Sequence, residues 1–374
     1  MTDAAAYAPV LERARREIDE GLLPSCQLAV ARQGELILHE TFGDAAPDQR
    51  YVIFSCTKAL IAAVIWQLLR DGELRLDDTA AGYVEAFASN GKDGITIEQL
   101  LVHTGGFPTA PMPPADGADP NRRAERYARW RTTFEPGTHF EYHPTAGHWI
   151  LADVIEAITG TDYRTVVHER VAAPHGLDRL RLGEPVDRQG DIATIVAVGE
   201  PPTPAELEAV IGVPLDIADL IGEVTADALV GFNDPMTRAV GFPGAGGISD
   251  AASLALFYQA LLHDPHDLWG PDRMAWATQV RCDLPDPVRG NPAHRSLGLI
   301  VAGDPPDAQL RGFGHGGSPR TFGHDGAGGQ IAWCDPDSGV SFVYLTNGMD
   351  QHVLREARRK IGLSSRVARA TAAT

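Results

Sequence analysis

The segment from Lys58 to Arg70 constrains the fold more than any other part of this chain. It reads Lys-Ala-Leu-Ile-Ala-Ala-Val-Ile-Trp-Gln-Leu-Leu-Arg, a run of helix-forming residues that is apolar at nearly every position. A helix that has no polar face must be covered by other elements on all sides. We therefore expect residues 58–70 to form a buried helix that crosses the core of the protein.

Ser55 lies three residues before Lys58, at the start of this helix. Side chains three positions apart share one face of a helix, so the hydroxyl and the amine can meet. A serine beside a lysine is an arrangement of nucleophile and base for acyl chemistry. The helix dipole would also favour negative charge on the attacking or carbonyl oxygen. A serine in this place can instead serve only as a helix cap, so both interpretations stay open at this point.

A second serine and lysine with the same spacing, Ser89 and Lys92, show how weak the short motif is by itself. The Asn-Gly pair between them is typical of a turn, and no apolar run follows. The buried helix after Ser55 is therefore the context that distinguishes the first pair from the second.

Lysine is rare in this chain. Of the 32 lysine and arginine residues, only Lys58, Lys92 and Lys360 are lysines. Arginine does not lose its proton in a protein, whereas a buried lysine can. A lysine at position 58 is what a general base would require. Compositional bias of the genome is the alternative explanation, and we favour the catalytic one.

Composition and length narrow the class of protein. A chain of 374 residues is long enough for two packed subdomains, and its net charge of −18 argues against nucleic acid or anionic membranes as partners. No run of 18 apolar residues predicts a membrane span, and the first residues lack the pattern of a signal peptide. The four cysteines are scattered without a C-x-x-C motif. We expect a cytoplasmic protein with no metal, no cofactor and no membrane span.

Strand patterns at both ends of the chain, with helical patterns between them, predict the architecture. We expect an α/β (α+β) fold in which an antiparallel sheet, built from both chain ends, is flanked by helices. The sheet lobe would comprise residues 1–74 and 240–374, and a mainly helical lobe would comprise residues 75–239. The acidic, proline-rich part at 183–239 is interpreted as a lid-like insertion, or alternatively as an ordinary surface excursion. A cleft between the lobes is the expected ligand site.

The individual elements follow from hydrophobic periodicity and from turn and capping residues. The expected helices include an amphipathic first helix, one at 99–103 after a Thr96–Gln99 capping box, one that starts at Pro144 and ends before Gly160, one that starts at Ser249 and runs over 250–262, and a last one after Asn347. The expected strands are a hairpin of 27–31 and 35–39, then 296–301, 330–334 and 340–345.

Two further segments complete a possible acyl-transfer site. Tyr142 lies just before the helix of the middle lobe, where its phenol could relay a proton while a nearby lysine cation lowers its pKa. Four of the seven residues from Gly323 to Gly329 are glycine, which permits a close approach of backbone and ligand. A backbone N–H of this segment and that of Ser55 would form an oxyanion hole. The chain contains no phosphate-binding loop, no G-x-S-x-G and no H-E-x-x-H.

Five motifs in order carry a resemblance to a known family. They are Ser55-Cys-Thr-Lys58, Leu100-Leu-Val-His-Thr-Gly-Gly106, Pro136-Gly-Thr-His-Phe-Glu-Tyr142, Gly244-Ala-Gly-Gly247 and Gly323-His-Asp-Gly-Ala-Gly-Gly329. Together they resemble the β-lactamase-related serine hydrolases, which include class C β-lactamases, penicillin-recognising peptidases and β-lactamase-like carboxylesterases. The resemblance covers residues 20 to 350.

The resemblance implies a β-lactamase/transpeptidase-like fold and a role for each site residue. Ser55 would be the acylated nucleophile, and Lys58 and Tyr142 would share the acid and base work. The backbone N–H groups of Ser55 and Ala327 would hold the oxyanion. We also expect three residues to contact the substrate, namely His324, Gly326 and Phe107.

Two departures from the family pattern favour the esterase branch. Lactamases usually read Tyr-x-Asn, whereas this chain has Pro144, which offers neither a side-chain amide nor an N–H. The lysine of their K-T-G motif is His324 here, which is mostly neutral at pH 7. Both changes weaken recognition of a lactam or a peptide carboxylate and are tolerable for a neutral ester.

We therefore predict a serine carboxylesterase that hydrolyses small neutral esters through an acyl-enzyme. The alternatives are a β-lactamase or a D-amino peptidase or amidase of the same fold, an acyltransferase with the same catalytic parts, and a catalytically silent homologue that binds an acyl ligand. The expected partner is a small-molecule ester.

Overall fold

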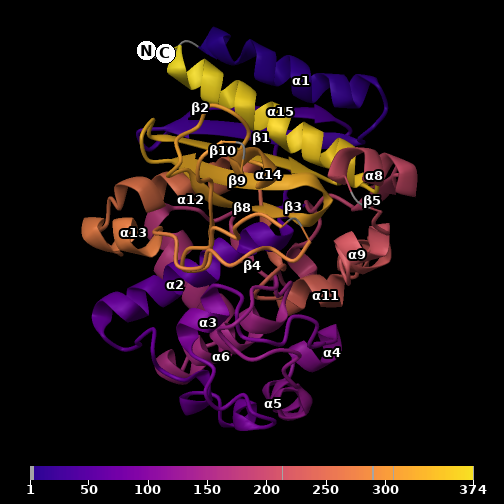
Figure 1. Cartoon of the computed structure of the whole chain (residues 1–374). Coiled ribbons are helices and arrows are strands. Elements are labelled where there is room, and N and C mark those ends of the chain that lie inside the picture. Colours follow the sequence, from indigo (N-terminus) through magenta and orange to yellow (C-terminus); the bar gives the residue numbers. More distant parts are fainter. Residues whose placement is uncertain (1–3, 213, 289, 306, 374) are drawn as a thin grey trace.

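The two ends of the chain build one six-stranded antiparallel sheet, as the strand pattern predicts (Figure 1). The computed structural model describes residues 4–212, 214–288, 290–305 and 307–373. The strand order is β2-β1-β10-β9-β8-β7. The strands are β1 (Ser25–Arg32), β2 (Glu35–Gly43), β7 (Ile300–Val301), β8 (Phe322–Gly326), β9 (Gln330–Asp335) and β10 (Val340–Thr346).

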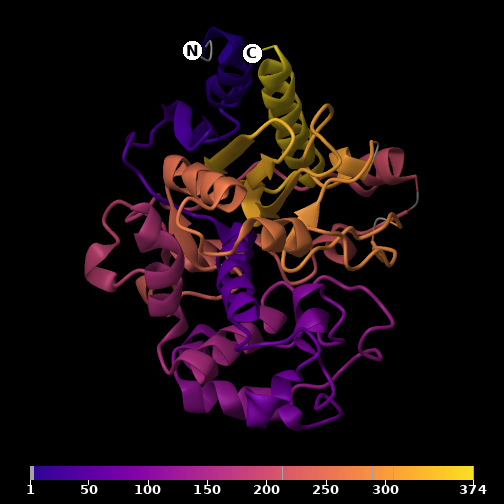
Figure 2. The same cartoon turned by 90° about the vertical axis from the view of Figure 1, so that its left-hand side faces the viewer.

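Both faces of the central strands are covered, because alternate side chains of a strand point to opposite faces. On one face, Leu28 and Val30 of β1 pack with α1 (Ala8–Asp19) and α15 (Val353–Ala372), which lie side by side near the two termini (Figure 2). On the other face, Ala29 of β1 packs with α12 (Ala251–His263), in the same core cluster as α2 (Lys58–Asp71). The small residue on this second face leaves room for a helix to approach closely.

Helix α2 runs through the middle of the molecule, which confirms the prediction from its sequence (Figure 1). Every residue from Lys58 to Leu69 is buried, and the helix ends at Gly72 in the left-handed conformation. Fully burying one large aliphatic side chain contributes about 1.5–3 kcal/mol to folding, so this helix is a major source of stability. It packs against α6 (Ala146–Thr159) on one side and against β8 on the other.

The helical middle of the chain agrees with the sequence in its elements but differs at two helix starts. The Thr96–Gln99 capping box is present, and it places the first helical residue at Ile97, so α3 spans Ile97–Leu101 rather than 99–103. Helix α6 begins at Ala146, so Pro144 precedes it instead of occupying its first position. The carbonyl of Pro144 is turned toward Lys58 instead.

The stretch from 183 to 239 contains a short strand and several short helices, of which α8 lies beside the N-terminal end of α15 (Figure 1). Strand β5 (Val196–Val198) pairs in parallel with β11 (Gly348–Asp350), which ties this stretch to the C-terminal part of the chain. Its helices are α8 (Pro204–Ile211), α9 (Ile217–Ile221), α10 (Ala226–Val230) and α11 (Pro235–Val240). Its role as a lid, and the division of the chain into lobes at 75 and 239, stay predictions.

The C-terminal third corrects two expectations. The strand expected at 296–301 is only β7, because Gly298 has a φ of +91° and the chain turns there against α2. Ser249 ends strand β6 (Gly247–Ser249), and Asp250 caps α12. The glycine-rich segment from Gly323 to Gly329 forms β8 and the 3-10 turn η9 (Ala327–Gly329), and β9, which follows it, lies inside the sheet.

The remaining helices complete the shell around the sheet and the middle part of the chain. They are α4 (Pro114–Gly117), α5 (Pro120–Arg129), α7 (Tyr163–Val167), α13 (Pro271–Ala277) and α14 (Asp307–Leu310). No helix among the described residues combines the length and the apolar character that crossing a lipid bilayer requires.

Strand β8 can approach β9 closely only because position 323 is glycine. A Cβ atom at Gly323 would stand 2.2 Å from the carbonyl oxygen of Ala332 and 2.6 Å from the Cα of Trp333. Gly323→Ala must therefore push the two strands apart, and we expect it to lower the free energy of unfolding by about 2–3 kcal/mol. Urea unfolding followed by circular dichroism measures this change. Gly190→Ala is the control, because a Cβ at Gly190 meets open space; equal stability of the two variants would contradict the prediction.

Candidate active site

Ser55 lies in a short turn at the entrance to the buried helix. The turn is the 3-10 element η2 (Phe54–Thr57), and α2 follows it directly at Lys58. Ser55 is partly exposed, whereas Phe54 and Cys56 on either side of it are buried. Phe54 has a φ of +44°, a conformation that a bulky side chain rarely adopts. Such backbone strain is typical of functional sites, where the surrounding structure holds it in place.

Lys58 is fully buried, and three oxygen atoms surround its amine. The Nζ atom lies 3.1 Å from the Oγ of Ser55, 2.7 Å from the carbonyl oxygen of Pro144 and 2.8 Å from that of Gly244. Burial, and after it the charge of Arg295, lowers the pKa of Lys58 well below the ordinary value for lysine. The structure therefore favours a neutral amine beside the serine hydroxyl.

Gly244 brings the second carbonyl to Lys58, and its own lack of a side chain makes this possible. A Cβ atom there would stand 2.9 Å from the carbonyl oxygen of Pro144 and 3.4 Å from the Nζ of Lys58. The Gly-Ala-Gly-Gly motif that starts at this residue thus has a local physical reason.

Tyr142 reaches the serine from the segment before α6. Its hydroxyl donates a hydrogen bond of 2.9 Å to the Oγ of Ser55, and the Nζ of Lys58 lies 5.0 Å from the centre of its ring. Burial raises the pKa of Tyr142 above its ordinary value, against the opposing effects of the Ser55 hydrogen bond and of Arg295. The expectation that a lysine cation would lower this pKa is therefore wrong, because burial outweighs the nearby charges.

The end of β8 lies against the turn that carries Ser55. A Cβ atom at Gly326 would stand 2.6 Å from the carbonyl oxygen of Ile53, and the thiol of Cys56 donates to the carbonyl of His324 at 3.2 Å. Ala327, the next residue along the chain, begins η9. This contact brings the expected oxyanion segment to the serine turn, and the donor role of the Ala327 N–H stays a prediction.

His324 is buried, and both of its ring nitrogens have neighbours inside the protein. Its Nδ1 lies 2.6 Å from the backbone oxygen of Asp325, and its Nε2 lies 3.4 Å from the Nη1 of Arg295. Burial, together with the charges of Arg295 and Lys58, lowers the pKa of His324 to about 3. This low pKa agrees with the expectation that His324 is mostly neutral at pH 7.

Arg295 is the residue of this site that sequence reasoning missed. Its guanidinium carbon lies 5.2 Å from the ring centre of Tyr142 and 5.4 Å from that of Phe140. It precedes the short strand β7 and pairs through its backbone with Cys282. Arginine is abundant in this chain, and nothing in the spacing of Arg295 marked it out.

Phe107 lies deeper than a substrate contact would suggest. Its side chain is 1% exposed, and its ring packs against Phe87, Trp130 and the imidazole of His143. Its backbone N–H donates to the Nε2 of His143 at 3.1 Å. The expected contact of Phe107 with substrate stays a prediction, and its position in the core gives it a packing role.

The second serine–lysine pair has a different hydrogen-bond pattern. Lys92 is buried and donates to the carbonyls of Ser89 and Trp130, and burial lowers its pKa to about 8. Its Nζ lies 3.3 Å from the hydroxyl of Ser89, but that hydroxyl donates its own proton to the carbonyl of Ala128. The proton of Ser89 thus points away from the amine, and the pair anchors a turn.

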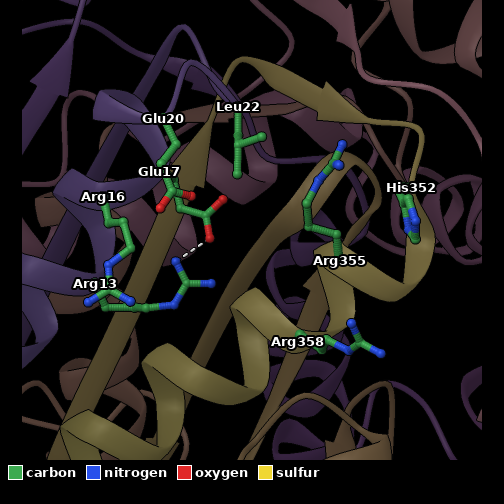
Figure 3. Close-up of a pocket in the computed structure, with 8 residues that line it drawn as sticks. All are labelled: Arg13, Arg16, Glu17, Glu20, Leu22, His352, Arg355 and Arg358. Carbon is green, nitrogen blue, oxygen red and sulfur yellow. Dashed lines mark ion pairs between the residues drawn. The ribbon is translucent and has the colours of Figure 1, made fainter.

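A cavity of about 380 Å³ lies between α1 and α15, on the sheet face opposite α2 (Figure 3). Its arginines are partly neutralised, because Arg13 pairs with Glu17 and Arg355 pairs with Asp350. Because it lies on the sheet face opposite α2, this cavity is separate from Ser55. The residues that line it are Arg13, Arg16, Glu17, Glu20, Leu22, His352, Arg355 and Arg358.

The similarity of this chain to known proteins extends over nearly its whole length. The family model Beta-lactamase matches residues 11–364. The esterase/beta-lactamase LipL of Mycobacterium tuberculosis (strain ATCC 25618 / H37Rv) is 28% identical over 324 residues, which cover 81% of this chain and 70% of LipL.

Two solved structures share the fold. A penicillin-binding protein homolog from Caulobacter crescentus superposes with a TM-score of 0.78 at 26% identity, over 98% of this chain and 97% of the homolog. A family VIII carboxylesterase superposes with a TM-score of 0.76 at 25% identity, over 96% of each chain. The expected fold class is thereby confirmed.

Proposed function

The chain belongs to the beta-lactamase family of serine hydrolases, and on that premise we propose that it hydrolyses small neutral carboxylic esters through an acyl-enzyme on Ser55. The observation that carries the proposal is the hydrogen-bonded cluster of Ser55, Lys58 and Tyr142 at the start of a buried helix. A serine nucleophile needs a base within hydrogen-bond reach, and this cluster supplies one.

The surroundings of Lys58 support its role as that base. A neutral amine has two N–H groups, and the carbonyls of Pro144 and Gly244 lie at hydrogen-bond distance to accept both. The lone pair then faces the hydroxyl of Ser55, 3.1 Å away, and can accept its proton. Burial favours this neutral form.

The proposed reaction begins with attack of the Ser55 oxygen on the ester carbonyl, while Lys58 takes the serine proton. The carbonyl oxygen becomes negatively charged, and the backbone N–H groups of Ser55 and Ala327 stabilise it. Tyr142 gives its phenolic proton to the departing alkoxide and regains one from Lys58. Water then attacks the acyl-enzyme by the reverse relay and releases the acid.

Residues around the cluster favour an ester over a lactam or a peptide. Pro144 offers no side-chain amide for an amide substrate, and its carbonyl is already engaged by Lys58. His324 is neutral and buried, so it supplies no cation for a substrate carboxylate. The relative LipL is named an esterase/beta-lactamase, and one of the two similar structures is named a family VIII carboxylesterase.

A β-lactamase is the second candidate, because the name of the relative LipL pairs esterase with beta-lactamase. Nitrocefin separates the two candidates. We expect p-nitrophenyl esters to be hydrolysed with a kcat/KM at least about 100-fold higher than that for nitrocefin, a difference of nearly 3 kcal/mol in transition-state binding. A kcat/KM that is higher for nitrocefin than for the esters would indicate a β-lactamase instead of an esterase.

Intact-protein mass spectrometry with a fluorophosphonate probe tests the nucleophile itself. We expect one adduct, which peptide mapping places on Ser55, together with turnover of esters of graded acyl length. Adduct formation without hydrolysis would indicate an acyltransferase that lacks its acceptor. The absence of any adduct would indicate a silent acyl-binding homologue, and cleavage of D-amino acid amides in preference to esters would indicate a peptidase or amidase.

A further inference from the structure

Tyr142 has two basic side chains against its ring, those of Lys58 and Arg295, and only Lys58 belongs to the catalytic motif. Lys58 lies 5.0 Å from the ring centre and Arg295 lies 5.2 Å from it. A guanidinium at this distance from a phenol interacts favourably with the ring, and more strongly when both are partly shielded from water. Arg295 is partly buried here.

His324 contacts the guanidinium of Arg295. Arginine can only donate hydrogen bonds, so the Nε2 of His324, 3.4 Å from the Nη1 of Arg295, must be the acceptor. The proton of the neutral ring is then on Nδ1, where it is donated to the backbone oxygen of Asp325 at 2.6 Å. A protonated His324 would turn a donor toward Arg295, so the geometry requires a neutral imidazole.

Asp325 joins this arrangement to the last helix. Its carboxylate forms an ion pair of 3.0 Å with Lys360 of α15, which also pairs with Glu356 at 2.8 Å. The negative charge of Asp325 is thus compensated from the other side. The arginine remains the positive group that faces the tyrosine.

We propose that Arg295 is a positioning residue of this active site, a permanent cation that neutral His324 holds against Tyr142 so that Lys58 stays unprotonated and the phenol can release its proton. The proposal rests on the proposed function, because it assigns the electrostatic support of the Ser55, Lys58 and Tyr142 cluster. Arg295 acts through these groups and is not required to touch the ester.

Other groups near Lys58 do not replace this charge. Burial lowers the pKa of the surrounding histidines, to about 4 for His143 and to about 3 for His324, so they are neutral at pH 7. A cation disfavours a second positive charge on Lys58 and favours negative charge on Tyr142. The titratable and charged groups around Lys58 are Cys56 from η2, His103 after α3, Tyr142 and His143 from the segment leading into α6, His148 from α6 itself, Arg295, and His324 and Asp325 from β8.

The test is the pH profile of kcat/KM for a neutral p-nitrophenyl ester in Arg295→Gln and Arg295→Lys. Loss of the cation makes protonation of Lys58 easier, so the acidic limb of Arg295→Gln should move to higher pH by about one unit, with about tenfold lower activity below that limb. Arg295→Lys keeps a positive charge and should keep the limb close to its wild-type position. The rate of fluorophosphonate labelling at Ser55 should show the same shift.

Arg281→Gln is the matched control, because Arg281 is a neighbouring arginine that stacks on Trp276 at 4.6 Å. It should leave the pH profile unchanged. An unshifted acidic limb in Arg295→Gln, or an equal loss of activity at every pH, would overturn the role of Arg295. A wild-type protein that neither hydrolyses esters nor forms a Ser55 adduct would instead overturn the proposed function and, with it, the assignment of Arg295.

Discussion

Replacing Ser55 by alanine is expected to lower kcat for p-nitrophenyl esters by at least about 10⁴-fold, because the acyl group loses its only point of attachment. The Oγ of Ser55 is hydrogen-bonded to Lys58 and Tyr142, and the side chain is only partly buried. Its removal deletes one oxygen atom and leaves no large cavity. Steady-state hydrolysis and fluorophosphonate labelling measure the effect.

The fold of Ser55→Ala should remain intact, which circular dichroism and a thermal melt can establish. Ser89→Ala is the matched control, because Ser89 belongs to the other serine–lysine pair and is hydrogen-bonded to the carbonyl of Ala128. It should keep wild-type activity. Persistent ester hydrolysis by pure Ser55→Ala protein would refute Ser55 as the nucleophile.

Replacing Lys58 by arginine, another basic residue, is expected to reduce kcat by about 10³-fold or more. An arginine cannot lose its proton near neutral pH, so it cannot accept the proton of Ser55. The lysine is also enclosed by the carbonyls of Pro144 and Gly244, which leave little room for a larger guanidinium. Kinetics of ester hydrolysis between pH 6 and pH 9 would reveal the loss.

Lys92→Arg separates loss of the base from loss of stability. Lys92 is also buried and also donates to two carbonyls, but it lies in the turn around Ser89. Both variants should lower the melting temperature, whereas only Lys58→Arg should lose activity in the fraction that stays folded. A fully active Lys58→Arg enzyme would show that lysine is not the base.

Local patterns were sufficient to predict most elements of this fold. The apolar run after Ser55 predicted α2, and the Thr96–Gln99 capping box predicted α3, although two residues too late, because both depend on neighbours within a few residues. Other errors fell where distant segments meet. Gly298 turns against α2 and shortens a predicted strand, and Pro144 lies outside its helix with its carbonyl directed to Lys58.

The candidate site shows the same division. Spacing along one helix turn suggested that Ser55 and Lys58 meet, and the structure places their polar atoms 3.1 Å apart. Tyr142 comes from a segment 87 positions away from Ser55, and its place before a helix and the order of the motifs pointed to it, without showing that the two hydroxyls meet. The catalytic roles of these residues, and of Ala327, Gly326 and Phe107, remain predictions for the experiments above.

By itself, the sequence determined a buried helix, the serine–lysine pair at its start, a sheet made from both chain ends, and membership of a family whose motifs occur in order. The tertiary structure decided which carbonyls accept hydrogen bonds from the amine of Lys58. It also decided that burial raises the pKa of Tyr142 against the effect of the nearby charge, and that Arg295 lies against the ring of Tyr142. The physical reason is the distance along the chain over which each effect acts. Helix propensity and capping act between neighbours in the chain, whereas desolvation and charge depend on every group that folding brings within a few ångströms.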